Sequence, residues 1–397
     1  MDLRLELQEF KGSFDMEKAV CNHGFFMMAP NLWNPKTKSL TRPLRLSDSS
    51  STNVTISHQA SQPFLEIKVH DIDNVSRVDE ELIFQQVRRM LRLSDKDELQ
   101  VTEFQKLHEG AKKSNFGRIF RSPSLFEDMV KTLLLCFNTW ENSLRIASHL
   151  CKLQSKLAEN SEDREPRKEI VENFPSAKEI ASFKKELISE HCKLGYRDKW
   201  IHILANRIER GSLNLQKMES GEMEAEEIAK KVSNLKGFGL FATATVLMCI
   251  GHYHRVTCDT ETLRLFGELH GKEKYSKKTL EKQAQSLYHR FSPFQCLAYW
   301  FDLIRNYEEK LGKLSELDPC EYIKVSGCSK KQRVDASAEP DRIKTKVCKP
   351  KKRKPTKFIA ELMKTKPSKK KEPRKDYTCS LCKQAGHSCR TCPVLNA

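Results

Sequence analysis

The residues with the clearest chemical potential in this chain are two closely spaced glycines followed by a lone carboxylate. Gly237 and Gly239 stand one residue apart between two stretches with helical periodicity, so the backbone can turn tightly there. The amide N–H groups of such a turn point toward one spot, which suits an oxygen of a DNA phosphate. Asp259 follows twenty residues after the second glycine, before another helical stretch. A carboxylate at that place can cap the helix, oppose a developing positive charge or orient a water molecule.

A second set of chemically active residues lies near the end of the chain. Cys379, Cys382, His387 and Cys392 follow the spacing of a CCHC zinc knuckle. Three thiolates and one imidazole form a closed tetrahedral site, which is structural rather than catalytic. We therefore expect one structural Zn²⁺ there, which would supply most of the folding energy of so short a segment. Knuckles of this kind bind single-stranded nucleic acid or protein, and the spacing favours neither.

The positive charge of the chain is concentrated in the same region. Residues 321–397 contain 22 Lys and Arg but 7 Asp and Glu, so they carry +15 of the net charge of +17. Such a tail attracts nucleic acid through counterion release, or serves only as a solvated segment with an import signal. The run Lys349–Lys354 predicts nuclear import, hence a nuclear location.

Cysteine usage and hydropathy narrow the class further. The first residues show no secretory signal, so the 14 cysteines indicate a reducing compartment rather than a disulfide framework. The longest apolar run, Leu240–Ile250, is too short to span a bilayer, and no membrane contact is expected.

The residue pattern predicts a small β region followed by a helical one. Alternating and β-branched residues predict strands at Leu3–Phe10, Ser39–Ser47, Asn53–His58 and Phe64–Asp71. From about Val78 to Leu311 the apolar residues recur at helical spacing, with helices at Ala225–Leu235 and Leu240–Ile250 on either side of the two glycines. Ser124 and Glu127 predict a capping box at the start of one helix, with Pro123 in its first turn.

These patterns divide the chain into four parts. We expect an antiparallel β domain at 1–75, a helical domain at 76–317, a disordered basic linker at 318–375 and the zinc knuckle at 376–397. The expected fold class is α+β, with the small N-terminal sheet packed on a mainly helical bundle that contains a helix-hairpin-helix motif.

Five motifs recur in order along the first 311 residues: Gly117–Pro123, Phe174–Ser176, Leu194–Arg197, Lys236–Gly239 and Asp259. Their order resembles the helix-hairpin-helix (HhH-GPD) DNA glycosylases, in the branch of the 8-oxoguanine and 3-methyladenine enzymes. The resemblance implies that the hairpin holds the DNA backbone and that Asp259 acts on the sugar of a flipped nucleotide. It also implies double-stranded DNA with a damaged base as the partner.

The same resemblance assigns further residues. In members with lyase activity a lysine stands where this chain has Phe241, so the resemblance implies a monofunctional hydrolase. Lys236 replaces the usual proline of the hairpin and is expected to meet phosphate. Tyr196 and Arg197 match the intercalating pair of the family, and Asn138 matches the asparagine that reaches the estranged base.

The base pocket is left with two alignments. One places Gln295 at the amide that recognises oxidised guanine, and the other places Tyr299 there, one helical turn away. Glu261 stands where the oxidised-guanine enzymes have a histidine, and Phe241 and Tyr299 would suit stacking on an alkylated ring. The class of damaged base therefore stays open. The cysteines after the hairpin are too sparse for an iron–sulfur cluster, and none is expected.

The sequence thus predicts a monofunctional DNA N-glycosylase of base excision repair, with Asp259 as its catalytic residue. The alternatives are a non-catalytic nucleic-acid-binding protein on a glycosylase-like fold, and a protein-interaction scaffold whose tail alone binds nucleic acid.

Overall fold

The computed structural model describes residues 1–7, 14–60, 62–70, 72, 74–153, 171–271, 275–276 and 279–326. The predicted zinc knuckle, nearly all of the predicted basic linker and the import run lie outside these residues. No helix among the described residues is both long enough and apolar enough to cross a membrane.

Five antiparallel strands form one sheet from the N-terminal part of the chain. They are β1 (Asp2–Glu6), β2 (Leu32–Asn34), β3 (Ser39–Arg45), β4 (Ser51–Ser57) and β5 (Phe64–Val69), in the order β1-β5-β4-β3-β2. All four predicted strands are present, and β2 is an addition. Buried and less buried residues alternate along β1, β4 and β5, so one face of the sheet supplies apolar side chains to the core.

The rest of the described chain is mainly helical. Its helices are α1 (Met16–Val20), α2 (Arg77–Leu91), α3 (Asp95–Leu107), α4 (Glu109–Lys113), α5 (Leu125–Leu135), α6 (Trp140–Cys151), α8 (Ala177–Ser182), α9 (Lys185–Cys192), α10 (Arg197–Glu209), α11 (Leu215–Glu219), α12 (Ala225–Ser233), α13 (Leu240–Cys249), α14 (Thr260–His270), α15 (Leu280–Leu287) and α16 (Gln295–Leu311). Short 3-10 helices are η2 (Gly24–Met27), η4 (His289–Phe291), η5 (Leu314–Glu316) and η6 (Pro319–Lys324). The α+β class is therefore confirmed.

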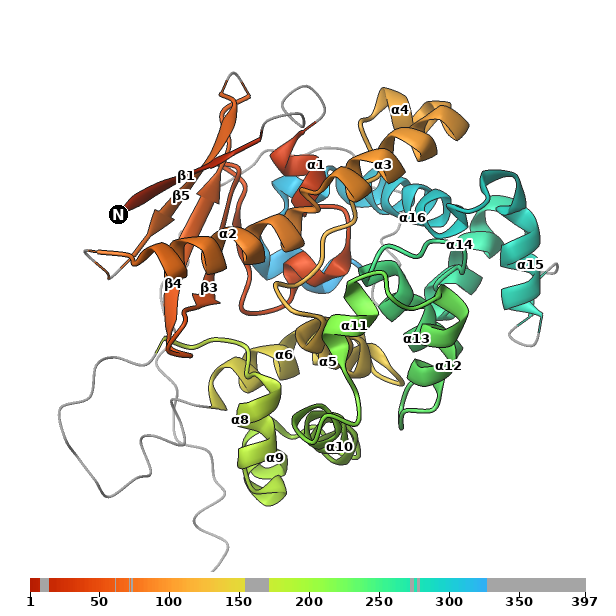
Figure 1. The fold of residues 1–397 in the computed structure, drawn as a ribbon. Helices are drawn as coiled ribbons and strands as arrows, with labels where there is room; N and C mark the ends of the chain where they lie inside the picture. The colour runs from red at the N-terminus through yellow and green to blue at the C-terminus, as the bar shows by residue number, and fades with distance from the viewer. Residues whose placement is uncertain are drawn as a thin grey trace, which may run out of the picture. The chain divides into compact units, whose positions relative to one another are not determined.

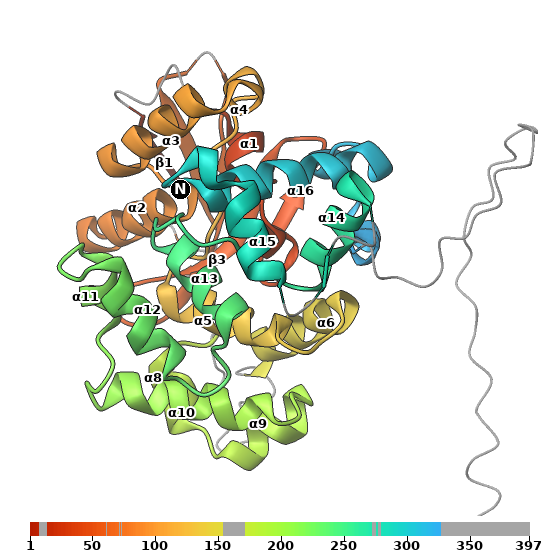
Figure 2. The same ribbon diagram turned by 90° about the vertical axis from the view of Figure 1, so that its right-hand side faces the viewer.

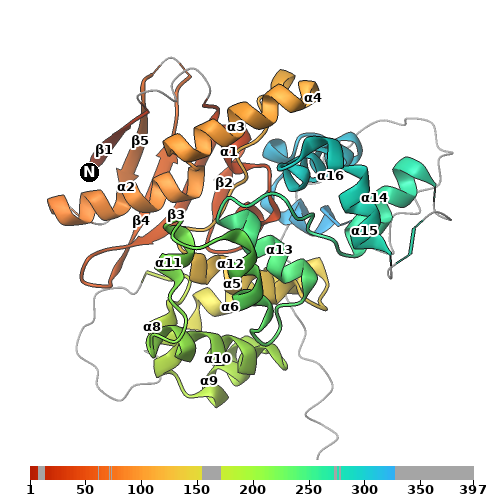
Figure 3. The ribbon, with the colours of Figure 1, turned by 45° about the vertical axis from the view of Figure 1, so that its right-hand side comes forward.

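The helices form groups around the sheet and around α13. Figure 1 shows α2 lying across the sheet, with the helical body beside it. Figures 2 and 3 show α8, α9 and α10 together at one end of that body and α14, α15 and α16 at another. Residues 242–249 of α13 are all buried, as expected for a helix that is apolar on every side.

A buried ion cluster joins the sheet to α5. Arg42 of β3 donates to both carboxylate oxygens of Glu127, at 3.3 and 3.0 Å, and Lys131 contacts the same carboxylate at 2.7 Å. The predicted capping box at this helix is therefore only half correct. Ser124 accepts a hydrogen bond from the Glu127 amide, but the Glu127 side chain is drawn into the ion cluster. The helix begins at Leu125, so Pro123 precedes it.

The folded region extends past the predicted boundary at residue 317. The Tyr322 ring in η6 packs edge-on against Phe26, and the Tyr322 carbonyl accepts a hydrogen bond from the Trp140 indole at 2.7 Å. The segment after α16 thus covers part of the core, because it buries an aromatic side chain against α6 and η2.

Candidate functional site

The hairpin between α12 and α13 needs glycine at its first glycine position. Gly237 has a φ of +92°, a conformation that side chains strongly disfavour. A Cβ atom there would lie 2.5 Å from Trp200 of α10 and 2.7 Å from Leu133 of α5. Phe238 is buried next to it. The hairpin therefore rests directly on α10 and α5, and Gly237 is required for that packing.

Gly239 differs from Gly237 in both respects. Its φ is −79°, and a Cβ atom there would meet nothing within 4 Å. It is the N-cap of α13 without a side-chain capping bond, and its neighbour Leu240 is largely exposed. Neither backbone strain nor packing calls for glycine here, so the missing side chain leaves the helix N-terminus uncovered. Lys236 is exposed on the same hairpin.

Asp259 is the N-cap of α14, as one alternative from the sequence predicted. Its Oδ1 accepts the Thr262 amide at 3.0 Å and lies 3.2 Å from the Thr262 hydroxyl, which itself accepts the Asp259 amide at 3.0 Å. Thr262 therefore fixes the orientation of the Asp259 carboxylate through these hydrogen bonds. Capping uses one oxygen of the carboxylate, so it is compatible with a chemical role for the other.

The surroundings of Asp259 change its ionisation. Burial raises the pKa of Asp259 from 3.8 to about 6, with the bonds from Thr262 opposing that rise and the charge of Glu261 adding to it. The group is still mainly ionised at neutral pH. A carboxylate that is partly removed from water interacts more strongly with a positive charge than a solvated one.

Glu261 has partners that neutralise its charge. Its Oε2 accepts from Arg264 Nε at 2.8 Å and from the Tyr307 hydroxyl at 3.0 Å. The acid that replaces the expected histidine is thus held in an ion pair on its own helix rather than standing as a second isolated negative charge.

The three predicted base-pocket residues differ in their burial and in their hydrogen-bond partners. Tyr299 is only 1% exposed, and its hydroxyl lies 2.8 Å from the Thr262 hydroxyl behind Asp259. Gln295, one turn earlier on α16, is buried, and its Oε1 has no hydrogen-bond partner among the described residues. Phe241 is half-buried against the core, in the first turn of α13. The hydroxyl of Tyr299 is therefore directed at the aspartate cap, not at an open pocket.

Arg197 is also placed differently from the expectation. It is 6% exposed, and its guanidinium donates to the carbonyls of Cys136 at 3.1 Å and Phe137 at 2.8 Å. It is therefore not displayed as a free donor for an estranged base. Its planar fork instead ties the start of α10 to the loop after α5.

Asn138 has a similar local role in this loop. Its Nδ2 donates to the Leu134 carbonyl at 2.9 Å, and its Oδ1 accepts from Asn142 at 2.7 Å. These bonds satisfy groups at the end of α5, where helix carbonyls lack intrahelical partners. Tyr196, by contrast, is 48% exposed beside Trp200, as an intercalating residue requires.

Phe137 is a candidate residue that the sequence motifs did not single out. It is 89% exposed and has a φ of +50°, so a large apolar side chain is presented to solvent from a strained backbone. The Arg197 guanidinium holds its carbonyl and lies 4.7 Å from the Tyr196 ring. The Cys136 thiol next to it has a pKa raised to about 11 by burial, with a smaller contribution from the charge of Asp259. Phe137 and Tyr196 therefore lie close to each other, with Arg197 between them.

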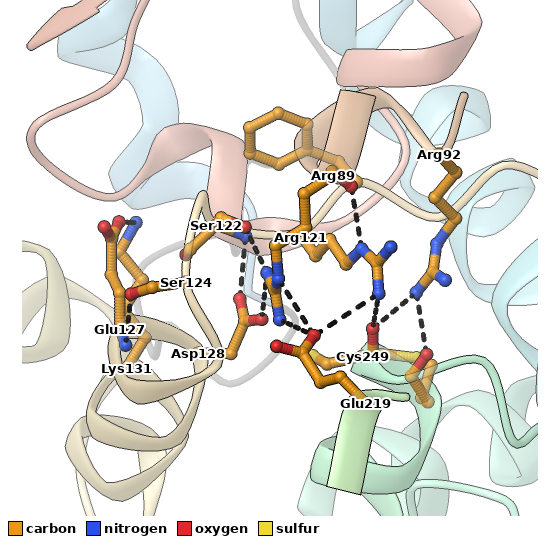
Figure 4. A network of polar contacts seen from close by, with 12 residues as sticks. Arg89, Arg92, Arg121, Ser122, Ser124, Glu127, Asp128, Lys131, Glu219 and Cys249 are labelled. Atoms are coloured by element: carbon orange, nitrogen blue, oxygen red, sulfur yellow. Dashed lines mark hydrogen bonds and ion pairs between the residues drawn. The ribbon is translucent and has the colours of Figure 1, made fainter. Parts of the chain in front are cut away.

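A polar network fixes the far end of α13, from which the chain runs to Asp259. Figure 4 shows Arg92 and Arg121 pointing at the last carbonyls of this helix. Arg92 donates to Met248 at 2.7 Å, and Arg121 donates to Cys249 at 2.7 Å. Cationic side chains at a helix C-terminus satisfy its carbonyls and its dipole. The C-terminal end of the hairpin helix is thus anchored by two arginines from earlier in the chain.

No three His, Cys, Asp or Glu side chains among the described residues are grouped so that they could hold a metal ion. The four predicted zinc ligands, Cys379, Cys382, His387 and Cys392, lie outside those residues.

Comparison with known proteins gives a likeness in fold. No family model matches the chain, and no curated protein matches it. A solved 3-methyladenine DNA glycosylase from Archaeoglobus fulgidus superposes with a TM-score of 0.51 at 16% identity, covering 77% of this chain and 99% of that one. An 8-oxoguanine glycosylase/lyase from Clostridium acetobutylicum, in complex with DNA, gives a TM-score of 0.47 at 17% identity, covering 72% and 92%. The chain therefore has a DNA glycosylase fold, and the predicted resemblance is confirmed at that level.

Proposed function

We propose that this protein is a DNA glycosylase that hydrolyses the N-glycosidic bond of a damaged base in double-stranded DNA. The observation that carries the proposal is the partly buried carboxylate of Asp259, held in one direction by Thr262 at the start of α14. Positive charge develops on the sugar as the glycosidic bond breaks, and a fixed carboxylate stabilises it or orients the attacking water.

The hairpin supports binding of the DNA backbone. The uncovered N-terminus of α13 offers amide groups and the positive end of a helix dipole to a phosphate, with Lys236 exposed beside it. Gly239 has no structural need to be glycine, which fits a position where another molecule approaches the backbone closely.

The exposed aromatic residues support extrusion of a base. An enzyme that acts on a base within a duplex must flip that base out and fill the resulting gap. Phe137 and Tyr196 are both available for this purpose, and Arg197 fixes the loop of one to the helix of the other. We therefore assign the gap-filling role to Phe137 and Tyr196, and a supporting role to Arg197.

We propose further that the enzyme lacks lyase activity. Phe241 occupies the position of the lyase lysine, and the nearby Lys236 lies exposed on the hairpin. On a panel of duplexes that each contain one oxidised, alkylated or deaminated base, at least one base should be released. Strand cleavage should then appear only after alkali, and borohydride should trap no covalent protein–DNA adduct. Efficient trapping would contradict the monofunctional assignment.

The zinc knuckle and the nuclear location are also proposals, supported by the spacing of Cys379, Cys382, His387 and Cys392 and by the basic run Lys349–Lys354. The purified full chain should contain one Zn²⁺. Cys382→Ser should lose it, whereas Cys389→Ser, which alters the extra cysteine of the same segment, should keep it. Equal zinc content in all three proteins would contradict the ligand set.

A non-catalytic nucleic-acid-binding protein is the second candidate. It is favoured by Glu261 in place of the expected histidine and by the net charge of +2 over the first 320 residues. The two candidates differ in one outcome, since only the enzyme releases a base from the duplexes that it binds.

A further inference from the structure

Tyr299 has a restricted set of contacts for so large a polar side chain. It is fully buried on α16, and among the described residues its hydroxyl has one hydrogen-bond partner, the Thr262 hydroxyl at 2.8 Å. Burying a phenol hydroxyl is unfavourable unless its hydrogen is donated. The contact with Thr262 therefore has to satisfy the Tyr299 hydrogen.

The direction of each hydrogen bond follows from this requirement. Thr262 Oγ1 already accepts the Asp259 amide at 3.0 Å, and a hydroxyl oxygen has room for a second donor. If Tyr299 donates to Thr262, the single Thr262 hydrogen is available for Asp259 Oδ1 at 3.2 Å, which is nearer than its other acceptor, the Thr257 carbonyl at 3.4 Å. The reverse direction would leave the Tyr299 hydrogen without an acceptor. The chain of donors thus runs from Tyr299 through Thr262 to Asp259.

We propose that Tyr299 is a positioning residue that acts through Thr262 to hold Asp259 in one orientation and in its ionised form. The inference rests on the proposed function in that Asp259 is taken as the reacting carboxylate. In this proposal Tyr299 supports Asp259 and does not recognise the damaged base, because its hydroxyl is already hydrogen-bonded to Thr262.

The charges around Asp259 show why such support is needed. Glu261, on the same helix, disfavours a second negative charge, although Arg264 forms an ion pair with it and the Tyr307 hydroxyl donates to it. The charge of Asp259 also acts on the thiols of Cys136 and Cys258, but burial raises the pKa of each above its ordinary value, so both thiols are neutral at physiological pH. No cation among the described residues is hydrogen-bonded to Asp259. Hydrogen bonds to the ionised form therefore oppose burial, and donors linked in a chain strengthen one another.

The ionisation of Asp259 can be measured without a substrate. In the full chain labelled with ¹³C at the aspartate carboxyl carbon, the Asp259 signal is assigned by its loss in Asp259→Asn. Its titration midpoint should lie near 6 in the wild type. It should rise by about half a unit or more in Tyr299→Phe and in Thr262→Val, since each removes support for the ionised form.

Two variants serve as matched controls. Tyr288→Phe removes another buried tyrosine hydroxyl, which donates to Asp302 at 2.9 Å and lies next to Tyr299 without contacting Thr262. Thr262→Ser keeps the hydroxyl that links the chain. Both should leave the Asp259 midpoint unchanged. Thr262→Val interrupts the same series of hydrogen bonds at its middle member. Its titration midpoint is therefore the one to measure if Tyr299→Phe does not fold.

The pH profile of base release gives the second readout. Under single-turnover conditions the acid limb of the profile should move upward in Tyr299→Phe by the same amount as the titration midpoint. An unchanged midpoint in folded Tyr299→Phe, or an equal shift in Tyr288→Phe, would overturn the inference. A shifted midpoint without base release from any duplex would support the positioning role and contradict the proposed function.

Discussion

Two loops rest on helix α10, and they are held in opposite ways. The α12–α13 hairpin is fixed by its own backbone, since Gly237 takes a positive φ and lies where a Cβ atom would meet Trp200 at 2.5 Å. The loop after α5 is fixed from outside, because the Arg197 guanidinium holds the carbonyls of Cys136 and Phe137. One loop depends on the absence of a side chain and the other on the presence of a distant one.

The comparison teaches where each loop can be altered without loss of the fold. The hairpin has a rigid position at Gly237 and an open one at Gly239, two residues later. The α5 loop has a structural anchor in Arg197 and an exposed side chain at Phe137. In both loops, therefore, the residue that holds the structure is separate from the residue that is open to solvent.

The largest effect on stability is expected at Gly237. Gly237→Ala should lower the free energy of unfolding by about 2–5 kcal/mol, because it adds a disfavoured φ and a clash with Trp200 and Leu133. Gly239→Ala should change it by less than about 1 kcal/mol but weaken duplex binding roughly tenfold, because the methyl group covers the helix N-terminus. Urea unfolding and duplex titration measure the two quantities. Equal destabilisation by both substitutions would remove the distinction between the glycines.

A somewhat smaller effect is expected at Arg197. Arg197→Met should lower the free energy of unfolding by about 2–4 kcal/mol, because it leaves buried carbonyls without donors. The matched control is Arg305→Met, which removes an exposed arginine paired with Glu309 and should cost no more than about 0.5 kcal/mol. If both variants unfold at the same urea concentration, Arg197 does not anchor the α5 loop.

Phe137 should show the reverse pattern. Phe137→Ala should leave the free energy of unfolding within about 0.5 kcal/mol, since the side chain is exposed. It should slow single-turnover base release roughly 10- to 100-fold, because the flipped state loses the group that fills the gap. Leu32→Ala, at an exposed leucine of β2, should affect neither quantity. Wild-type release by Phe137→Ala would assign the gap-filling role to Tyr196 alone.

The smallest effect concerns stability and pH at Asp259. Its pKa in the folded protein, about 6, lies above the ordinary 3.8, so ionisation is less favourable in the folded than in the unfolded state. This destabilisation is fully present above pH 6 and disappears as the pH falls from 6 to below 4. Asp259→Asn, which keeps a good N-cap residue, should therefore be more stable than wild type at pH 7.5 by on the order of 1–2 kcal/mol, and not at pH 4. Lower stability of the variant at pH 7.5 would show that the ionised carboxylate stabilises the fold.

The sequence predicted the parts of this molecule that depend on local rules. The alternating strands, the turn at Gly237 and the cap at Asp259 follow from backbone preferences and short-range spacing. The positions of Arg197 and Tyr299 could not be predicted in this way. The acceptor of Arg197 is about 60 residues earlier, and the partner of Tyr299 is 37 residues away on another helix. Motif matching assigns both residues to DNA or to the damaged base. Only the packed structure shows that their polar groups are already hydrogen-bonded within the protein.

The exposure of Phe137 is another feature that the local sequence could not predict. An aromatic residue beside a helix end is normally expected in the core, and nothing in its local sequence indicates a left-handed backbone. Its backbone is held from another helix by the buried Arg197, which donates to the Phe137 carbonyl.

The role of Asp259 is tested most directly by single-turnover base release from a duplex that the wild type processes. Asp259→Asn should bind that duplex with nearly wild-type affinity and release the base roughly 10²- to 10⁴-fold more slowly, in line with the loss of a preorganised charge or general base. The matched control, Asp302→Asn, alters another carboxyl of raised pKa, on α16, and should release the base at the wild-type rate. Release by folded Asp259→Asn at the wild-type rate would contradict the assignment of Asp259 as the catalytic residue.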